Sequence, residues 1–178
     1  NYSLLAVIEY GLGNIDEAKK LISKAEQIFE ATYESNHSEI ANCYSIHASV
    51  EKSLGNLEEA KRLQMKAIEI QKDIFEQNSP YLANSFIILA TIERSLGNNA
   101  EARRLQLQAI KIQEKTFEPN SNFLTSSYSI LASIDKELGN LEEAKRLYLK
   151  IVEIHKSSSE PNYLDIANKY NEIAIIEY

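Results

Sequence analysis

The chain has 178 residues, 44% of them hydrophobic and 25% charged, so it has enough apolar material for a folded core and is not expected to be disordered. Five glycines and three prolines leave little turn material, which disfavours a many-stranded β protein and favours helices. A single cysteine excludes a disulfide framework, and a formal net charge of -7 opposes bulk attraction to nucleic acid or anionic lipid. We expect a helical protein in a reducing, cytoplasmic setting, without nucleic-acid or membrane partners.

A Leu-Gly-Asn motif recurs four times along the chain, each copy 42 residues after the previous one. Its flanks align without insertion or deletion, and the three prolines fall in a second helix-breaking segment between the copies. Such self-similarity indicates a repeat architecture in which each unit has two joints and, between them, two helices. The copies of the motif lie at 12–14, 54–56, 96–98 and 138–140.

Apolar residues between the joints recur at the spacing of amphipathic helices. In the unit with the clearest helix-breaking residues at both joints, this pattern predicts a first helix near 80–95 and a second near 99–118. We name these two positions the A helix and the B helix. Applying the 42-residue period predicts one array over 1–178, with repeats at 1–36, 37–78, 79–120 and 121–162 and a partial A helix at 163–178.

The Leu-Gly-Asn joint predicts a sharp turn between the A and B helices. Gly55 can take the left-handed conformation that ends a helix, and Asn56 can cap the next helix in a box with Glu59. At the other joint, Ser79 is expected to cap an A helix that Pro80 opens. The asparagine and glutamate recur as Asn14 with Glu17, Asn98 with Glu101 and Asn140 with Glu143.

A two-helix unit cannot bury its apolar face alone, so successive units must stack. The expected fold is therefore all-α, an α-solenoid of about four stacked antiparallel helix pairs. Because both termini fall inside an A-helix pattern, we expect the chain to be a segment of a longer solenoid.

Small and aromatic residues recur at fixed positions of the two helices. The A helices share Ala6, Ala48, Ala90, Ala132 and Ala174, preceded by Tyr2, Tyr44, Phe86, Tyr128 and Tyr170, and the B helices share Ala18, Ala60, Ala102 and Ala144. Over the whole chain, and most closely over 78–98, this pattern resembles the tetratricopeptide repeat, with a period like that of kinesin light chains. The resemblance implies a right-handed superhelix whose concave face, lined mainly by A helices, binds extended or helical peptides.

An acid stands where that family usually has tyrosine, seven residues after the A-helix aromatic. It lies near a packed seam, where a carboxylate without a donor would be costly. Because it recurs in every repeat, whereas an active site is usually unique, we interpret it as a structural, hydrogen-bonded group rather than a functional acid. The series is Glu9, Glu51, Glu93, Asp135 and Glu177. The expected donors are Gln64, Gln106, tyrosine hydroxyls of a neighbouring repeat, or the basic series Lys20, Arg62, Arg104 and Arg146.

The opposite face of each A helix is expected to form a peptide-binding groove, because these positions line the groove in the family that the chain resembles. Short hydroxyl and amide side chains offer donors and acceptors, and a basic row of Lys52, Arg94 and Lys136 favours an acidic peptide. An ordinary solvated helix face is the alternative. The predicted groove residues are Asn42, Ser45, Ser49, Lys52, Asn84, Ile87, Thr91, Arg94, Ser126, Ser129, Ser133, Lys136, Asn168 and Asn171.

The sequence offers no support for catalysis, metal binding or a cofactor. His37, His47 and His155 lack the spacing of metal ligands, Cys43 has no paired base, and the glycines are isolated turn residues rather than a phosphate loop. We predict a non-catalytic scaffold or adaptor that binds a protein or peptide partner. Two alternatives stay open: a ligand-sensing arm of a signalling ATPase or transcription regulator, and a structural spacer or array that self-associates end to end.

Overall fold

The computed structural model describes residues 2–33, 37–119, 121–158 and 161–177. Over these residues the chain forms nine α-helices and no β-strand, which confirms the all-α prediction. The predicted repeat boundaries at 36 and 120, and both terminal residues, lie outside the described ranges. The helices are α1 (Tyr2–Gly11), α2 (Ile15–Thr32), α3 (Ser38–Ser53), α4 (Leu57–Ile74), α5 (Pro80–Ser95), α6 (Asn99–Thr116), α7 (Asn122–Glu137), α8 (Leu141–Ser157) and α9 (Tyr163–Glu177).

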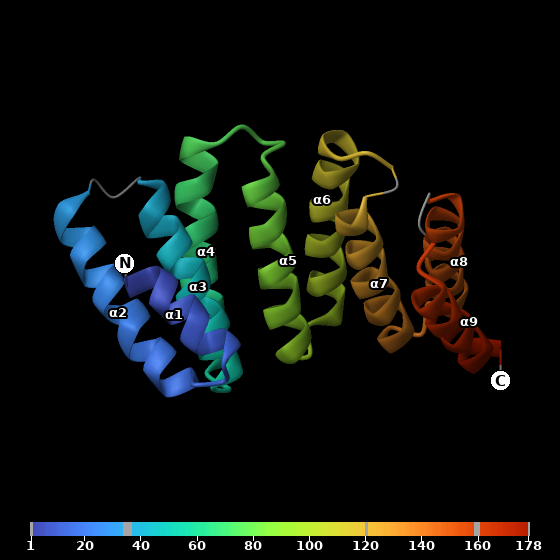
Figure 1. Cartoon of the computed structure of the whole chain (residues 1–178), viewed down its shortest axis with the longest axis horizontal. Helices are drawn as coiled ribbons and strands as arrows, with labels where there is room; N and C mark the ends of the chain where they lie inside the picture. Colours follow the sequence, from blue (N-terminus) through green and yellow to red (C-terminus); the bar gives the residue numbers. More distant parts are fainter. Residues whose placement is uncertain (1, 34–36, 120, 159–160, 178) are drawn as a thin grey trace.

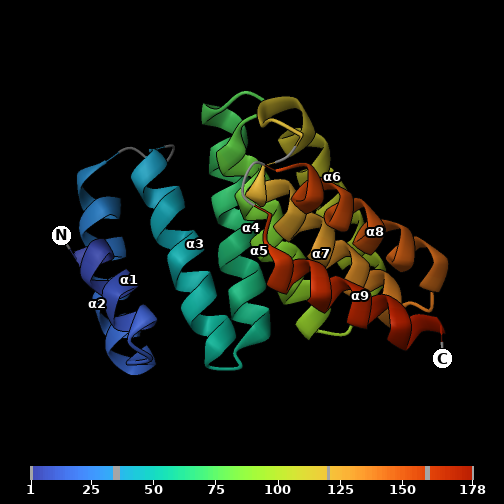
Figure 2. The ribbon, with the colours of Figure 1, turned by 45° about the vertical axis from the view of Figure 1, so that its right-hand side comes forward.

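The helices form a row of antiparallel pairs, with the two ends of the chain at opposite ends of the row (Figure 1). Helix α1 packs on α2, α3 on α4, α5 on α6, and α7 on α8, while α9 packs on α8. Each B helix also packs against the next A helix, so the pairs stack into the predicted α-solenoid (Figure 2). Helix α3 contacts both α1 and α5, which places these A helices side by side.

The Leu-Gly-Asn joints contain left-handed glycines, as the sequence predicted. Gly55 has a φ of +82°, a conformation that glycine adopts without the Cβ clash of other residues. The turn lets the Asn56 N–H donate to the Glu51 carbonyl oxygen at 2.9 Å, which closes the last turn of the A helix. The equivalent glycines are Gly13, Gly97 and Gly139.

The asparagine after each glycine does not cap the B helix, so that prediction is wrong. The Asn98 side chain makes no capping hydrogen bond at the start of α6, and its amide instead donates to the Glu93 carboxylate, 2.8 Å away. Glu101, the expected partner in the capping box, accepts a hydrogen bond from Arg104 on the same helix. The asparagine therefore fixes the turn through the acid of the preceding A helix.

Side chains cap the A helices at the other joint, as predicted. Ser79 Oγ accepts a hydrogen bond from the Tyr81 N–H at 3.3 Å, and Pro80 occupies the first turn. Ser121 caps α7 in the same way, and His37 caps α3 through its Nδ1 atom.

Alanines at the helix crossings allow the close packing on which the stack depends. Those of α1 to α8 have no exposed surface, whereas Ala174 on α9, the last helix of the stack, is exposed. The fully buried members are Ala6, Ala48, Ala90 and Ala132 on A helices and Ala18, Ala60, Ala102 and Ala144 on B helices. Within the described ranges, no helix combines the length and hydropathy needed to cross a bilayer.

Candidate functional site

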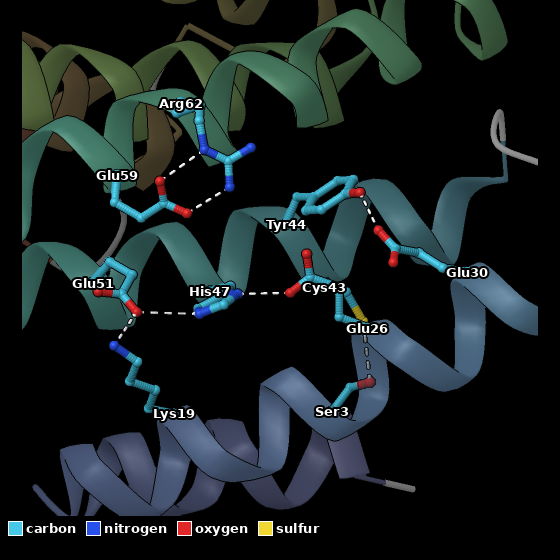
Figure 3. Close-up of polar contacts among 10 residues, drawn as sticks. All are labelled: Ser3, Lys19, Glu26, Glu30, Cys43, Tyr44, His47, Glu51, Glu59 and Arg62. Carbon is cyan, nitrogen blue, oxygen red and sulfur yellow. Dashed lines mark hydrogen bonds and ion pairs between the residues drawn. The ribbon is translucent and has the colours of Figure 1, made fainter.

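In three of its five copies the recurring acid of the A helix is buried between successive repeats and paired there, which confirms the hydrogen-bonded seam at those positions, whereas Glu9 is half-buried and Glu177 is exposed. The Glu51, Glu93 and Asp135 side chains are at most 4% exposed, and each accepts a hydrogen bond from the asparagine five residues later. Each also pairs with a cation on the preceding B helix, as Figure 3 shows for Glu51. The pairs are Lys19–Glu51 at 2.7 Å, Lys61–Glu93 at 2.9 Å, Arg103–Asp135 at 2.7 Å and Lys145–Glu177 at 2.5 Å.

The donors predicted for this seam are wrong, because the cation is the residue before the predicted one. Glutamates three residues earlier on the same helix bind the predicted series Lys20, Arg62, Arg104 and Arg146. The Gln64 and Gln106 amides donate to the carbonyl oxygens of Ser85 and Ser127. Each B helix carries two basic residues in succession, and only packing shows that the first of them faces the seam.

The predicted groove residues lie on α3, α5, α7 and α9, and polar contacts between neighbouring A helices cross this face. The Tyr10 hydroxyl lies 2.9 Å from Ser53 Oγ, and Arg94 reaches Glu137. We call this surface the A-helix face. Its exposed members are Asn42, Asn84, Ser126, Asn168 and Asn171; Ser45 is buried; and Ser49, Lys52, Ile87, Thr91, Arg94, Ser129, Ser133 and Lys136 are half-buried. Their role in binding stays a prediction.

The hydroxyl groups along the middle of the A-helix face already donate to the helix backbone. Ser49 donates to the Ser45 carbonyl oxygen at 3.0 Å, and Thr91 donates to that of Ile88 at 2.9 Å. Ser133 repeats the contact on α7. These side chains are therefore available to a ligand mainly as acceptors, whereas the sequence suggested both roles.

The basic row of the A-helix face is largely neutralised by carboxylates from the next A helix. The Arg94 Nε atom lies 2.9 and 3.0 Å from the two carboxylate oxygens of Glu137, and this bond raises the pKa of Arg94. Lys136 Nζ lies 2.6 Å from Glu172, which raises its pKa as well. Burial and the charge of Arg94 lower the pKa of Lys52, which has no ion-pair partner among the described residues.

Five open pockets lie on the other side of the stack, each between two successive B helices with an A helix as its floor. One has a volume of about 890 Å³ and lies between α4 and α6 over α5. None of the five is lined by a predicted groove residue. The sequence analysis placed no site on this side of the stack, although Phe86, where most repeats have tyrosine, distinguishes the α5 repeat in the sequence.

His47 belongs to the seam between repeats rather than to a metal site. Its Nδ1 atom lies 2.7 Å from Glu26 and its Nε2 atom 3.2 Å from Glu51 (Figure 3). Burial favours the neutral ring, but the hydrogen bonds and charges of the two glutamates outweigh it and raise the pKa of His47.

Burial also raises the pKa of the Cys43 thiol, which lies 3.5 Å from Ser3 Oγ. In the part of the chain that the structure describes, no cluster of three or more His, Cys, Asp or Glu residues could hold a metal ion.

Solved structures with the same stacked arrangement cover 98% of this chain. The TPR-like repeats of a kinesin light chain-like protein from Podosopora anserina match with a TM-score of 0.87 and 23% identity over 83% of that chain. BtubC (BKLC) from P. vanneervenii matches at 0.84 with 17% identity over 70% of its chain, and the apo form of RapI at 0.76 with 18% identity over 68%. No curated protein is significantly similar in sequence.

The family model described as "Tetratricopeptide repeat" matches the chain three times in overlapping windows, over residues 1–73, 39–115 and 81–157. These windows follow the helix pairs of the structure and confirm the family that the recurring alanines and aromatics indicated. Repeats of this kind generally mediate protein–protein interaction. This chain belongs to the tetratricopeptide repeat family.

Proposed function

We propose that this chain is a non-catalytic scaffold or adaptor that binds a peptide or helical segment of a partner protein along its A-helix face. The general role of the family supports the proposal. So does the surface itself, where exposed amides lie beside half-buried hydroxyls that can accept hydrogen bonds from an extended chain.

The proposal rests chiefly on the environment of Lys52, which favours a partner segment with a carboxylate. Arg94 shows how this face holds a carboxylate, because the Glu137 side chain lies across its guanidinium group. One repeat earlier, the residue equivalent to Glu137 is Ser95, whose hydroxyl donates to the Thr91 carbonyl oxygen. Lys52 is therefore half-buried without an internal anion within the described ranges, and a partner's carboxylate can fill that place.

Selection from a library of short random peptides tests this function. We expect the selected peptides to be rich in Asp and Glu, and Lys52→Glu to weaken their binding by about tenfold or more, roughly 1.4 kcal/mol. Lys24→Glu, on the B helix α2, makes the same change in charge away from this face and serves as the control. Equal weakening by the two variants, or no enrichment of acidic peptides, would refute the proposed site.

Exposed apolar side chains on α1 and α9 support self-association as a second candidate function. Leu4 is 60% exposed on α1, and Leu164 is 74% exposed on α9. Light scattering over a range of concentrations should then show a rise in mass, and Leu4→Glu with Leu164→Glu should abolish it. A constant monomer mass in the unmodified protein would contradict this function.

A further inference from the structure

A tyrosine on the A helix is held by side chains from both flanking B helices in two of the repeats. The Tyr128 hydroxyl donates to Glu114 on α6 at 2.7 Å, and it accepts a hydrogen bond from Lys150 on α8 at 2.7 Å. The Lys150 ammonium also lies 4.1 Å from the centre of the tyrosine ring. The corresponding residues around α3 are Tyr44, Glu30 and Lys66. This polar bridge ties successive B helices together over the A helix.

The repeat that contains α5 has lost all three members of this bridge. Phe86 replaces the tyrosine, Lys72 the glutamate and Gln108 the lysine, so neither the hydroxyl nor its two partners are present. These same three residues line both the pocket of about 890 Å³ and a second one of about 460 Å³. The two pockets thus form one cleft along α5, between α4 and α6. We call it the α5 cleft.

The floor of the α5 cleft is apolar, and one of its ends is basic. Leu82, Phe86 and Leu89 on α5, together with Ile112 on the adjoining α6, belong to or pack on the hydrophobic core. The smaller pocket is lined by three cations and no acid. The cations are Lys72, Lys111 and Lys115.

These three lysines form no ion pair in the described part of the chain, although Glu69 and Asp73 line the larger pocket beside Lys72. Lys115 Nζ makes one long contact of 3.4 Å with Asn78 Oδ1, an uncharged amide. At the other end of the cleft, by contrast, Lys61 is paired with Glu93, and Arg104 with Glu101. Unpaired lysines beside an apolar floor, in a chain with a net charge of -7, fit a ligand that is acidic and partly apolar.

We propose that the α5 cleft is a second binding site, which takes an acidic peptide segment. The segment places an aliphatic or aromatic side chain on Phe86 and its carboxylates against Lys72 and Lys111. This site lies on the B-helix side of the stack and shares no lining residue with the A-helix face, so it stands independently of the function proposed above.

The chain itself supplies the variant that closes the cleft. Lys72→Glu, Phe86→Tyr and Gln108→Lys together rebuild the bridge seen around Tyr44 and Tyr128, and should leave the melting temperature unchanged or higher. Lys72→Glu alone tests the charge, and Lys24→Glu on α2 is its control with the same change in charge. All variants are made on a Lys52→Glu background, which removes binding at the A-helix face, so failure of the α5 cleft is separated from failure of that face.

The test is fluorescence anisotropy with an array of acidic peptides that differ in one central residue, which is Leu, Phe or Ser. We expect the Leu and Phe peptides to bind the Lys52→Glu background chain. Binding should weaken tenfold or more in the triple variant, in Lys72→Glu and for the Ser peptides, but not in Lys24→Glu. The proposal is overturned if no peptide binds the background chain more tightly than the triple variant, or if Lys24→Glu weakens binding as much as Lys72→Glu. Binding of single-stranded RNA or anionic vesicles in preference to every peptide would overturn it too.

Discussion

Arg103 on α6 and Asp135 on α7 form an ion pair that joins two successive helix pairs. Arg103 Nε donates to Asp135 Oδ1 at 2.7 Å, and the Asn140 amide donates to the same oxygen at 2.8 Å. The Asp135 side chain has no exposed surface, and its Oδ2 atom accepts no hydrogen bond from the described residues. The negative charge of Asp135 therefore depends on one cation and one amide.

Removing that cation should destabilise the fold strongly. Arg103→Met keeps much of the side-chain length but leaves a buried carboxylate with the Asn140 amide alone. We expect a loss of about 3 kcal/mol in the free energy of unfolding, because an unpaired buried charge keeps its desolvation cost. Denaturant unfolding followed by circular dichroism measures this change.

Arg104→Met is the matched control for this prediction. Arg104 pairs with Glu101 on the surface of the same helix, and the Arg104 side chain is 55% exposed. Its loss should cost no more than about 0.5 kcal/mol. Similar losses in the two variants would show that the buried seam has no special role in stability.

Asn98 should tolerate substitution poorly even by good capping residues. At a true N-cap, Ser and Asp are as favourable as Asn. Since the Asn98 amide instead donates to Glu93, Asn98→Ser should cost about 1 kcal/mol, and Asn98→Asp should cost more because it places a second anion beside Glu93. Thermal melts of the two variants measure the effect, and unchanged melting temperatures would restore the capping role.

Gly97 should resist replacement because of its backbone alone. A Cβ atom would meet nothing within 4 Å, but the φ of +82° disfavours any L side chain. Gly97→Ala should therefore cost about 1 to 2 kcal/mol. Gly11→Ala is the control, because Gly11 has equal space around it and ordinary helical backbone. It should be neutral or stabilising, and equal losses at the two positions would contradict the conformational argument.

His47 should make the stability of the α2–α3 seam dependent on pH. Both ring nitrogens face carboxylates, so both can donate only when the ring is protonated. Because the folded state raises the pKa of His47, its contribution is complete below the unfolded pKa of about 6.5 and is lost as the pH rises through the higher folded value.

His47→Leu, the residue found at this position in other repeats, removes that titration. The melting temperature of the unmodified chain minus that of the variant should fall as the pH is raised from about 6 to about 8. Taking the difference cancels the titrations that the two proteins share. Glu51 contacts His47, but its lowered pKa lies below this pH range. A difference that stays constant over this range would exclude His47 as the source.

The sequence alone determined the architecture, because its signals are local or periodic. The Leu-Gly-Asn motif marked the left-handed turns, the recurring alanines marked the helix crossings, and the acid at each seam required a partner. Each of these follows from the properties of one residue or from a fixed spacing along one helix. They predicted the all-α solenoid and the family correctly.

Only the tertiary structure decided which polar side chains meet. Lys19 and Lys20 are chemically identical neighbours, but their side chains point about 100° apart around the helix. Packing of the helix therefore decides that Lys19 pairs with Glu51. The Glu137 carboxylate on Arg94 and the α5 cleft likewise depend on residues from neighbouring repeats. The cleft is lined by residues from three different helices, Lys72, Phe86 and Gln108. It forms because stacking brings those three helices together.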